Sequence, residues 1–324
     1  MSSAFVSLIE STIAAALLAV SGVACAQPFA YITNQGSDSV SVIDLAIDKV
    51  ISTIPVGKGP VGVAIADNAQ KAYISNVESN SISIIDTEQN KVIDEIKLSG
   101  SPVGLVVSPD ENTLYVADWF DDQVLAIDTH HPQTRRIAEV GKAPAGMVVS
   151  RDGSRLFVAN RDSNDVAVVD TASLLVVSHI QVGTHPFGVA ISPDGHSLYA
   201  VNVYANSVNV IDVASGQSTA TIRVGDHPYC ATVSADGKRV YVSNTQGDSV
   251  TVIDPTTRRA IATIPVDSIP EGITYSASNN RIYVASWGDD TVSVIDASSN
   301  QRLASIPTGK QSRAFGQFIA AARH

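Results

Sequence analysis

Residues 71–86 read KAYISNVESNSISIID, and this stretch decides the fold: two short runs rich in β-branched and aromatic residues flank a polar loop. The arrangement returns 42 residues later as TLYVADWFDDQVLAID at 113–128. Along the chain its aromatic position recurs seven times at the same step, at Tyr31, Tyr73, Tyr115, Phe157, Tyr199, Tyr241 and Tyr283. A repeat of this length without insertions or deletions predicts an array of similar supersecondary units.

Each unit is predicted to contain four β-strands. In the second unit, runs at 61–66, 71–75, 81–85 and 91–98 alternate with turns of Asp, Asn and Ser. Many runs place apolar or small residues at consecutive positions, so these strands need cover on both faces. Sheets stacked around an axis provide that cover. The sequence therefore predicts an all-β fold, a seven-bladed β-propeller of four-stranded antiparallel blades.

The two ends of the repeat array predict how the ring closes. The first unit begins at its second strand, at residues 30–34, and therefore lacks an inner strand. The tail at 313–320 falls where an eighth inner strand would begin. We expect this C-terminal strand to close blade one and leave no open edge, although Gln317 stands where other units have an apolar residue such as Ile65.

Residues 1–26 have the features of a cleaved signal peptide. An apolar run at 12–20 precedes Ala24-Cys25-Ala26, which fits a small-x-small cleavage site, although no Lys or Arg precedes the run. We predict a signal peptide at 1–26, a single propeller domain at 27–324 and a periplasmic or secreted location. Acylation of Cys25, as in a lipoprotein, is the alternative. No other run approaches the ~18 apolar residues of a transmembrane span.

The composition excludes several classes of protein. Hydrophobic residues make up 44% of the chain and charged residues 16%, against roughly 25% charged residues in an average domain. These values exclude a disordered or fibrous chain. The 32 acidic and 21 basic residues give a net charge of −11, which disfavours duplex nucleic acid. A single-stranded nucleic acid stays among the partner classes.

Several strings resemble a known repeat family: YITN at 31–34, YISN at 73–76, YVSN at 241–244, VID at 42–44 and SPDG at 192–195. They resemble the YVTN β-propeller repeat, over essentially all of the chain after the signal peptide, and most of all YncE-type exported seven-bladed propellers. The resemblance implies relatives among archaeal surface-layer proteins and, more distantly, quinoprotein dehydrogenase subunits, nitrite-reductase haem domains and lactonases. It implies a propeller and not a reaction.

The repeat also separates structural residues from candidates for function, because a residue present in every unit most simply stabilises the blade. Asn residues after the second strand, such as Asn34, and the acidic pairs at 121–122 and 289–290 are interpreted as turn residues. The repeated aromatic is expected to pack between blades. The repeated aspartates are interpreted as turn caps that accept backbone N–H bonds, at Asp44, Asp86, Asp128, Asp170, Asp212, Asp254 and Asp296.

Residues that break the repeat gather in two sets of loops, which we expect to share one face. One set joins the second and third strands, and the other precedes the inner strand. The predicted ligand-binding residues are Trp119, Phe120, Arg161, His185, Phe187, Tyr204, His227, Tyr229, Trp287 and Arg313, with Lys58, Lys142 and Lys310 as further cations. Trp119 and Trp287 are four units apart and are expected to face each other across the mouth. Aromatic faces beside cations suit an aromatic, sugar-like or anionic ligand, or a few unpaired bases.

His185, His227 and Cys230 offer ligand types that a soft divalent metal uses. No spaced motif supplies a further ligand, and a buried Cys is commonly inert. The sequence therefore predicts neither a metal nor a cofactor.

The leading functional hypothesis is an exported, non-catalytic propeller that binds a small ligand, a short polymer or a protein through its loop rim. The sequence contains no nucleophile elbow, phosphate-binding glycine loop or haem-attachment motif. One alternative is a periplasmic enzyme or enzyme subunit, such as a lactonase-like hydrolase or a quinoprotein dehydrogenase partner. Its candidate groups would be His185, His227, Glu271 and Arg313. A second alternative is a structural surface-layer protein.

Overall fold

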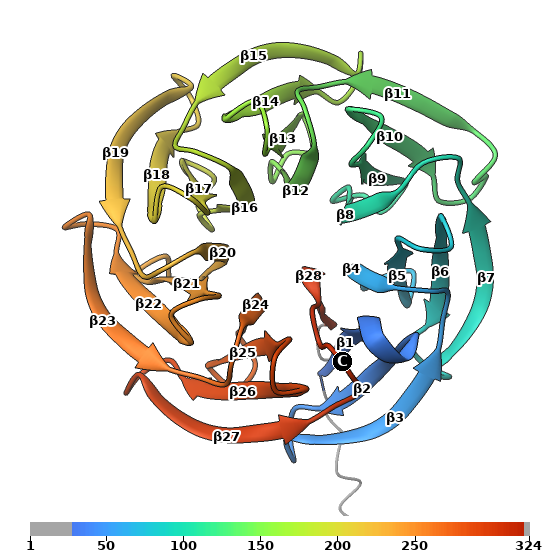
Figure 1. Cartoon of the computed structure of the whole chain (residues 1–324). Coiled ribbons are helices and arrows are strands. Elements are labelled where there is room, and N and C mark those ends of the chain that lie inside the picture. The colour runs from blue at the N-terminus through green and yellow to red at the C-terminus, as the bar shows by residue number, and fades with distance from the viewer. Residues whose placement is uncertain (1–27, 321–324) are drawn as a thin grey trace, which may run out of the picture.

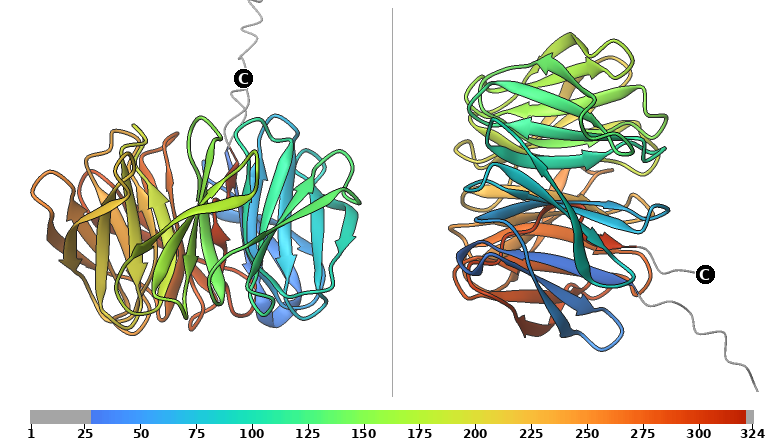
Figure 2. Two further views of the ribbon diagram at one scale, coloured as in Figure 1. Left: turned by 90° about the horizontal axis from the view of Figure 1, so that it is seen from above. Right: turned by 90° about the vertical axis from the view of Figure 1, so that its right-hand side faces the viewer.

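The computed structural model describes residues 28–320, which form seven β-sheets arranged as blades around one axis (Figure 1). The predicted all-β seven-bladed propeller is confirmed. Consecutive strands within a blade are antiparallel and succeed one another outward from the axis, and the blades stand between two loop faces (Figure 2). The signal-peptide prediction for 1–26 lies outside the described residues.

From the axis outward, blade 1 consists of β29 (Ile319–Ala320), β1 (Phe29–Asn34), β2 (Ser39–Asp44) and β3 (Lys49–Pro55), and blade 2 of β4 (Pro60–Ala66), β5 (Lys71–Asn76), β6 (Ser81–Asp86) and β7 (Lys91–Lys97). Blade 3 consists of β8 (Pro102–Val107), β9 (Thr113–Asp118), β10 (Gln123–Asp128) and β11 (Arg135–Glu139). Blade 4 consists of β12 (Pro144–Val149), β13 (Arg155–Asn160), β14 (Asp165–Asp170) and β15 (Leu175–Gln181). A 3-10 turn, η1 (Gln35–Ser37), joins β1 to β2.

Blade 5 consists of β16 (Pro186–Ile191), β17 (Ser197–Asn202), β18 (Ser207–Asp212) and β19 (Gln217–Arg223). Blade 6 consists of β20 (Pro228–Val233), β21 (Val240–Asn244), β22 (Ser249–Asp254) and β23 (Arg259–Pro265). Blade 7 consists of β24 (Pro270–Ser276), β25 (Arg281–Ser286), β26 (Thr291–Asp296) and β27 (Gln301–Pro307). A further short strand, β28 (Phe315–Gly316), lies inside the ring and pairs in parallel with β4 (Figure 1).

The C-terminal segment closes blade 1, as predicted, but it does so as an irregular strand. β29 pairs with β1, the backbone N–H of Tyr31 donates to the carbonyl of Phe318 at 2.8 Å, and the N–H of Arg313 donates to the carbonyl of Thr33 at 2.9 Å. Between these bonds the backbone takes positive φ at Ala314 (54°) and Gly316 (95°). These two residues turn the chain toward the axis, which explains why Gln317 does not fit the apolar pattern of the other inner strands.

The repeated aromatics hold neighbouring blades together, as predicted. All seven rings are buried, with exposed fractions of 4% or less. The hydroxyl of Tyr31 donates to the carbonyl of Thr87 at 3.2 Å, and that of Tyr241 donates to the carbonyl of Ala297 at 3.1 Å. Each bond reaches the outer turn of the next blade. Each ring therefore fills the space between two sheets, and the hydroxyls of Tyr31 and Tyr241 also bond to the neighbouring blade.

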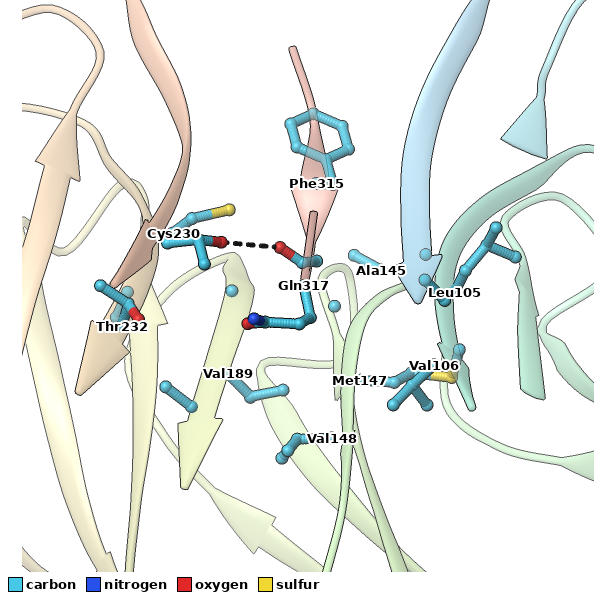
Figure 3. A pocket seen from close by; sticks show the side chains of 18 of the residues that line it. Leu105, Val106, Ala145, Met147, Val148, Val189, Cys230, Thr232, Phe315 and Gln317 are labelled. Atoms are coloured by element: carbon cyan, nitrogen blue, oxygen red, sulfur yellow. Dashed lines mark hydrogen bonds between the residues drawn. The ribbon is translucent and has the colours of Figure 1, made fainter. Parts of the chain in front are cut away.

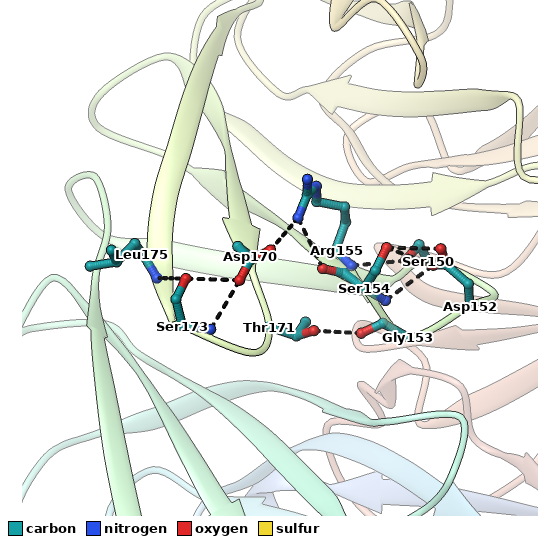
Figure 4. Close-up of polar contacts among 9 residues, drawn as sticks. All are labelled: Ser150, Asp152, Gly153, Ser154, Arg155, Asp170, Thr171, Ser173 and Leu175. Carbon is teal, nitrogen blue, oxygen red and sulfur yellow. Dashed lines mark hydrogen bonds and ion pairs between the residues drawn. The ribbon is translucent and has the colours of Figure 1, made fainter.

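The repeated aspartates are turn caps, as predicted. Figure 4 shows Asp170, which accepts the backbone N–H and the hydroxyl of Ser173 at 2.9 and 2.8 Å and pairs with Arg155. A second cap lies in the same view: the hydroxyls of Ser150 and Ser154, with the Ser154 backbone N–H, lower the pKa of Asp152 to about 2. Both turns lie on the face opposite to the predicted binding loops.

In two blades, the loop between the second and third strands is hydrogen-bonded to the segment that follows the outer strand and leads to the next blade. Asp122 and Asp290 have positive φ, and their carboxylates accept backbone N–H bonds from Ala143 at 2.8 Å and Gln311 at 2.6 Å. These contacts confirm the acidic pairs as turn residues, with the second member of each pair making the bond. The Asn34 amide accepts a backbone N–H as predicted, and it also donates to two serine hydroxyls of its own blade.

Candidate functional site at the loop face

The two predicted loop sets lie side by side in the same blade. The backbone N–H of Trp119 donates to the carbonyl of Ser101 at 3.2 Å, and equivalent bonds join Arg161 to Ala143 at 3.1 Å and Val203 to His185 at 2.9 Å. Each bond ties a loop between second and third strands to the loop that precedes the inner strand. Side chains from both loop sets therefore reach one surface, which we call the loop face.

At this face the inner segments present seven equivalent positions, and their sizes differ sharply around the ring. Phe187 and Tyr229 on neighbouring blades stack with ring centroids 4.0 Å apart, and Phe315 of β28 lies 5.1 Å from Phe187 and 5.3 Å from Tyr229. We call these three rings the aromatic plug. They pack against small residues of other blades, including Val61 of blade 2 and Ala145 of blade 4. The seven positions are Val61, Val103, Ala145, Phe187, Tyr229, Glu271 and Arg313.

The last two of these positions form a buried ion pair. Arg313 donates from Nε to one Glu271 oxygen at 2.5 Å and from NH2 to the other at 2.8 Å, and NH1 reaches Gln35 at 2.9 Å. Burial raises the pKa of Glu271, against the opposing effect of Arg313. Burial alone would lower the pKa of Arg313, but the charge and the hydrogen bonds of Glu271, together with the nearby Tyr229 and Cys230, outweigh burial and raise that pKa. The predicted ligand cation Arg313 is thus already committed to protein partners.

Outward of the plug lies a second group, which we call the rim cluster: Trp119, Arg161, His185, Tyr204 and His227. The Tyr204 ring lies between two imidazoles, 4.3 Å from His185 and 5.5 Å from His227. The guanidinium of Arg161 lies over the Trp119 ring, 5.6 Å from its centroid. The Trp119 ring in turn is 6.1 Å from Phe187, so the cluster continues into the plug.

Two aspartates balance the charge of the rim cluster. Asp162 pairs with Arg161 at 2.6 Å and lies 3.9 Å from Nε2 of His185. Asp226 contacts Nδ1 of His227 at 2.9 Å. Side-chain exposure is 25% for His185 and 28% for His227, whereas the whole Tyr204 residue is 56% exposed. Tyr204 is therefore the residue of this cluster that solvent reaches most readily.

The structure brings seven of the ten predicted residues into these two groups, places the Arg313 guanidinium beside the plug, 5.0 Å from the centroid of the Phe315 ring, and leaves two residues apart. Phe120 is 79% exposed, and Trp287 is half-buried on blade 7. Within residues 28–320 neither makes a ring contact with the rim cluster or the plug. The role of Trp287 opposite Trp119 stays a prediction. Lys58, Lys142 and Lys310 are exposed on the same loops.

Sequence reasoning missed Phe315 as a member of the plug. In the repeat it aligns with Val63 and Leu105, positions that point to a purely structural side chain. The signal that could have found it is the poor fit of the tail to the repeat, which begins at Arg313 and continues at Gly316 and Gln317.

Cys230 is a free thiol at the junction of the plug and the ring axis. Burial raises the pKa of this thiol well above its ordinary range, and the nearby Glu271 charge acts in the same direction. The thiol is therefore protonated at neutral pH, which disfavours metal binding. Across residues 28–320 no group of three or more His, Cys, Asp or Glu side chains has an arrangement suited to a metal ion.

Comparisons with known proteins support the fold. A model of the family described as Cytochrome D1 heme domain matches residues 61–188. Hydrazine synthase of Kuenenia stuttgartiensis is 24% identical with a TM-score of 0.74, over 82% of this chain and 91% of that chain. A functionally unknown protein from Desulfotomaculum acetoxidans is 14% identical with a TM-score of 0.76, over 91% and 99%. Dihydro-heme d1 dehydrogenase NirN, solved with DHE, is 14% identical with a TM-score of 0.67, over 88% and 74%.

These likenesses place the chain among propellers and leave the finer YVTN resemblance a prediction. The family match spans blades 2 to 4 and ends in β16, which is less than half of the chain. No curated protein matches the sequence. No helix among the described residues has the length and apolar character that crossing a membrane requires.

The family match makes haem the cofactor to test against the residues. Haem iron is held by a His nitrogen, by a Cys thiolate, by a Tyr oxygen, or by Met together with His. The residues that line the ring axis include Cys230 and Met147, and no histidine is among those described there. The Cys230 thiol is protonated, and the cation Arg313 at the inner end of the loop face is paired with Glu271. These residues do not fit a haem, and we derive no haem chemistry from them.

Proposed function

We propose that this protein is an exported, non-catalytic binding propeller that holds one face of a ring against the rim cluster. The ring is an aromatic or a sugar ring and belongs to a small molecule, a sugar polymer or a protein side chain. The observation that carries the proposal is that the residues departing from the repeat lie together on one surface. Eight side chains that break the 42-residue repeat meet on one face, although they come from five different inter-strand loops, from the inner strands β16 and β20 and from the C-terminal tail.

The chemistry of the rim cluster supports stacking. Tyr204 offers an exposed aromatic ring, and stacking of a base on such a ring contributes about 1–3 kcal/mol. The imidazoles of His185 and His227 flank that face and can donate or accept hydrogen bonds. Arg161 adds a positive charge beside Trp119, although Asp162 reduces its net attraction for an anion.

The test uses tryptophan fluorescence, because the chain has only two Trp residues. In a Trp287→Phe background, Trp119 is the sole reporter. We expect saturable quenching on titration with at least one of three ring-bearing probes: N-acetyltryptophanamide, cellotetraose or a short oligothymidylate. The responding probe identifies the ligand class. No response to any of the three would contradict binding of an aromatic or sugar ring at this site.

Matched variants locate the binding. In a filter or calorimetric assay with the responding probe, the double variant Trp119→Ala, Tyr204→Ala should bind about tenfold or more weakly, which corresponds to ~1.4 kcal/mol. Its melting temperature should remain close to that of the wild type. Trp287→Ala is the control, because Trp287 is the repeat equivalent of Trp119 and lies outside the rim cluster. Equal losses in both variants would argue for a site across the whole mouth.

A second candidate is an enzyme or an enzyme subunit, which the Cytochrome D1 heme domain match over blades 2 to 4 favours. Among its candidate groups, Glu271 and Arg313 are paired with each other. Titration with haemin, followed by the Soret band, tests this candidate directly. Stoichiometric uptake that is abolished by His227→Ala would replace the binding-scaffold proposal.

A further inference from the structure

On the inner side of the aromatic plug, the axis of the ring holds a cavity of about 410 Å³, which we call the channel cavity (Figure 3). This volume lies within the roughly 300–1,000 Å³ of ordinary small-molecule pockets. The cavity is lined by residues of β4, β8, β12, β16, β20 and β24 and by the C-terminal segment. It is separate from the rim cluster, since no member of that cluster lines it.

The walls of the channel cavity combine apolar side chains with uncharged hydrogen-bonding groups. Val106, Met147, Val148 and Val189 supply apolar surface, and Gln317 extends across the cavity toward Thr232 (Figure 3). The Gln317 amide makes a long hydrogen bond of 3.4 Å to the carbonyl of Ile319. Its position leaves most of the amide facing the cavity.

The strand topology adds further hydrogen-bonding groups. Strands β8, β12, β16 and β20 are the terminal strands of their sheets, so their inner edges face the axis with backbone N–H and C=O groups. β4 differs, because β28 pairs with its inner edge. Peptide groups of β8, β12, β16 and β20 thus face one side of the cavity, and on the other side β28 covers the inner edge of β4.

Charge decides which ligands this cavity accepts. Among the described residues that line it, none is Asp, Glu, Lys, Arg or His. Burial of an unpaired charge costs several kcal/mol or more, whereas uncharged donors and acceptors find peptide partners along the walls. The loop face is closed by the plug, and the lining continues away from the plug to Val107, Ile191 and Val233.

We propose that the channel cavity is a second binding site, which takes an uncharged small molecule with an apolar body and a hydrogen-bonding group, and that the ligand enters from the face opposite to the rim cluster. Gln317, at the irregular turn of the C-terminal segment, is the side chain that would hold the polar group. The deviation of the tail from the repeat thereby places an amide where every other unit has an apolar or aromatic residue.

The test uses two probes that differ in charge. N-phenyl-1-naphthylamine is neutral, and 8-anilino-1-naphthalenesulfonate carries the same ring system with a sulfonate. In fluorescence titrations of the mature protein, we expect the neutral probe to bind saturably and at least about tenfold more tightly than the anionic one. Absence of binding by the neutral probe, or equal binding of both, would overturn the proposal.

Two variants of blade 4 locate the neutral probe. Val148→Trp fills the cavity and should weaken binding about tenfold or more. Val177→Trp, on the outer strand β15 where Val177 is 54% exposed, should leave binding unchanged. Should Val148→Trp fail to fold, Gln317→Trp takes its place, because Gln317 is exposed to the cavity. Retained binding in the filled variant would overturn the proposal.

The rim variant separates this site from the loop face. Trp119→Ala, Tyr204→Ala should bind the neutral probe as the wild type does, whatever its effect on ligands of the rim cluster. Loss of the neutral probe in that variant would place it at the rim and overturn the proposal of a second site.

Discussion

At the scale of single residues, blade 7 replaces one packing arrangement with another. In blade 2, a Cβ on Gly57 would lie 2.6 Å from the Asn76 side chain, so only glycine fits beside that amide. In blade 7, Ser286 stands where the other blades have Asn or Asp, and Asp267 stands in the place of Gly57. The smaller Ser286 leaves room for the Asp267 carboxylate.

The Asp267 carboxylate takes over the hydrogen bonds of the missing amide. It accepts from Thr291 at 2.8 Å, Ser293 at 2.9 Å and Ser305 at 2.5 Å, and it pairs with Arg302 at 2.6 Å. We predict that Asp267→Gly destabilises the protein by about 1–3 kcal/mol, because the buried hydroxyl of Ser293 and the half-buried hydroxyl of Thr291 lose their acceptor. The double variant Asp267→Gly, Ser286→Asn should recover most of the loss. Thermal melting of the two variants tests this coupling, and an additive result would contradict it.

The same substitution has a predictable dependence on pH. Burial alone would raise the pKa of Asp267, but hydrogen bonds from Ser305, Thr291 and Ser293 outweigh it and lower that pKa. A carboxyl with a lowered pKa in the folded state stabilises the protein above its unfolded-state pKa, and this contribution disappears as the pH falls through the folded-state value. The melting temperatures of wild type and Asp267→Gly should therefore converge in acid. A constant difference down to pH 2 would contradict the assignment.

At the scale of elements, the C-terminal segment 312–320 links three blades. It completes blade 1 through β29, pairs with β4 of blade 2 through β28, and places Arg313 against Glu271 of blade 7. We predict that deletion of 312–324 lowers the free energy of unfolding by several kcal/mol, since a buried charge that loses its partner alone costs about 3–5 kcal/mol. Deletion of 321–324 is the control. Equal melting temperatures for the two truncations would refute closure by this segment.

The repeat suggests a control for the ion pair between Glu271 and Arg313, because other units have apolar residues at these two positions. Val61 and Val103 occupy the positions of Glu271 and Arg313 in other blades. Arg313→Val should cost about 3–5 kcal/mol, because it leaves Glu271 buried and unpaired. Glu271→Val with Arg313→Val should be close to neutral, because it removes both charges together. Chemical denaturation measures both variants, and a double variant as unstable as the single one would contradict this reasoning.

At the scale of the whole molecule, the ring was predictable because nearly all of its information recurs at a fixed step. A strand, its turn aspartate and its interblade aromatic lie within one unit, so seven copies report the same local physics. The plug was not predictable in the same way. It depends on where the chain goes after Ala314 and Gly316, whose positive φ values break the register of the tail.

The candidate site was predictable in membership and not in arrangement. Departures from the repeat identified Tyr204 and its histidine neighbours, but spacing cannot tell that the Tyr204 ring inserts between two imidazoles while Trp287 stays apart. Such contacts depend on rotamers in loops from different blades. The exchange between Asp267 and Ser286 was readable in principle, because two positions depart from the repeat together in one blade.

The central claim is that side chains departing from the repeat form the binding surface of an otherwise regular ring. Crystals of the protein soaked with a mixture of small planar fragments test it most directly, because the electron density shows where ligands lie without knowledge of the natural one. We expect fragments to stack on Tyr204 and Trp119 at the loop face. Fragments confined to the outer strands or to the turns around Asp152 and Asp170 would contradict it.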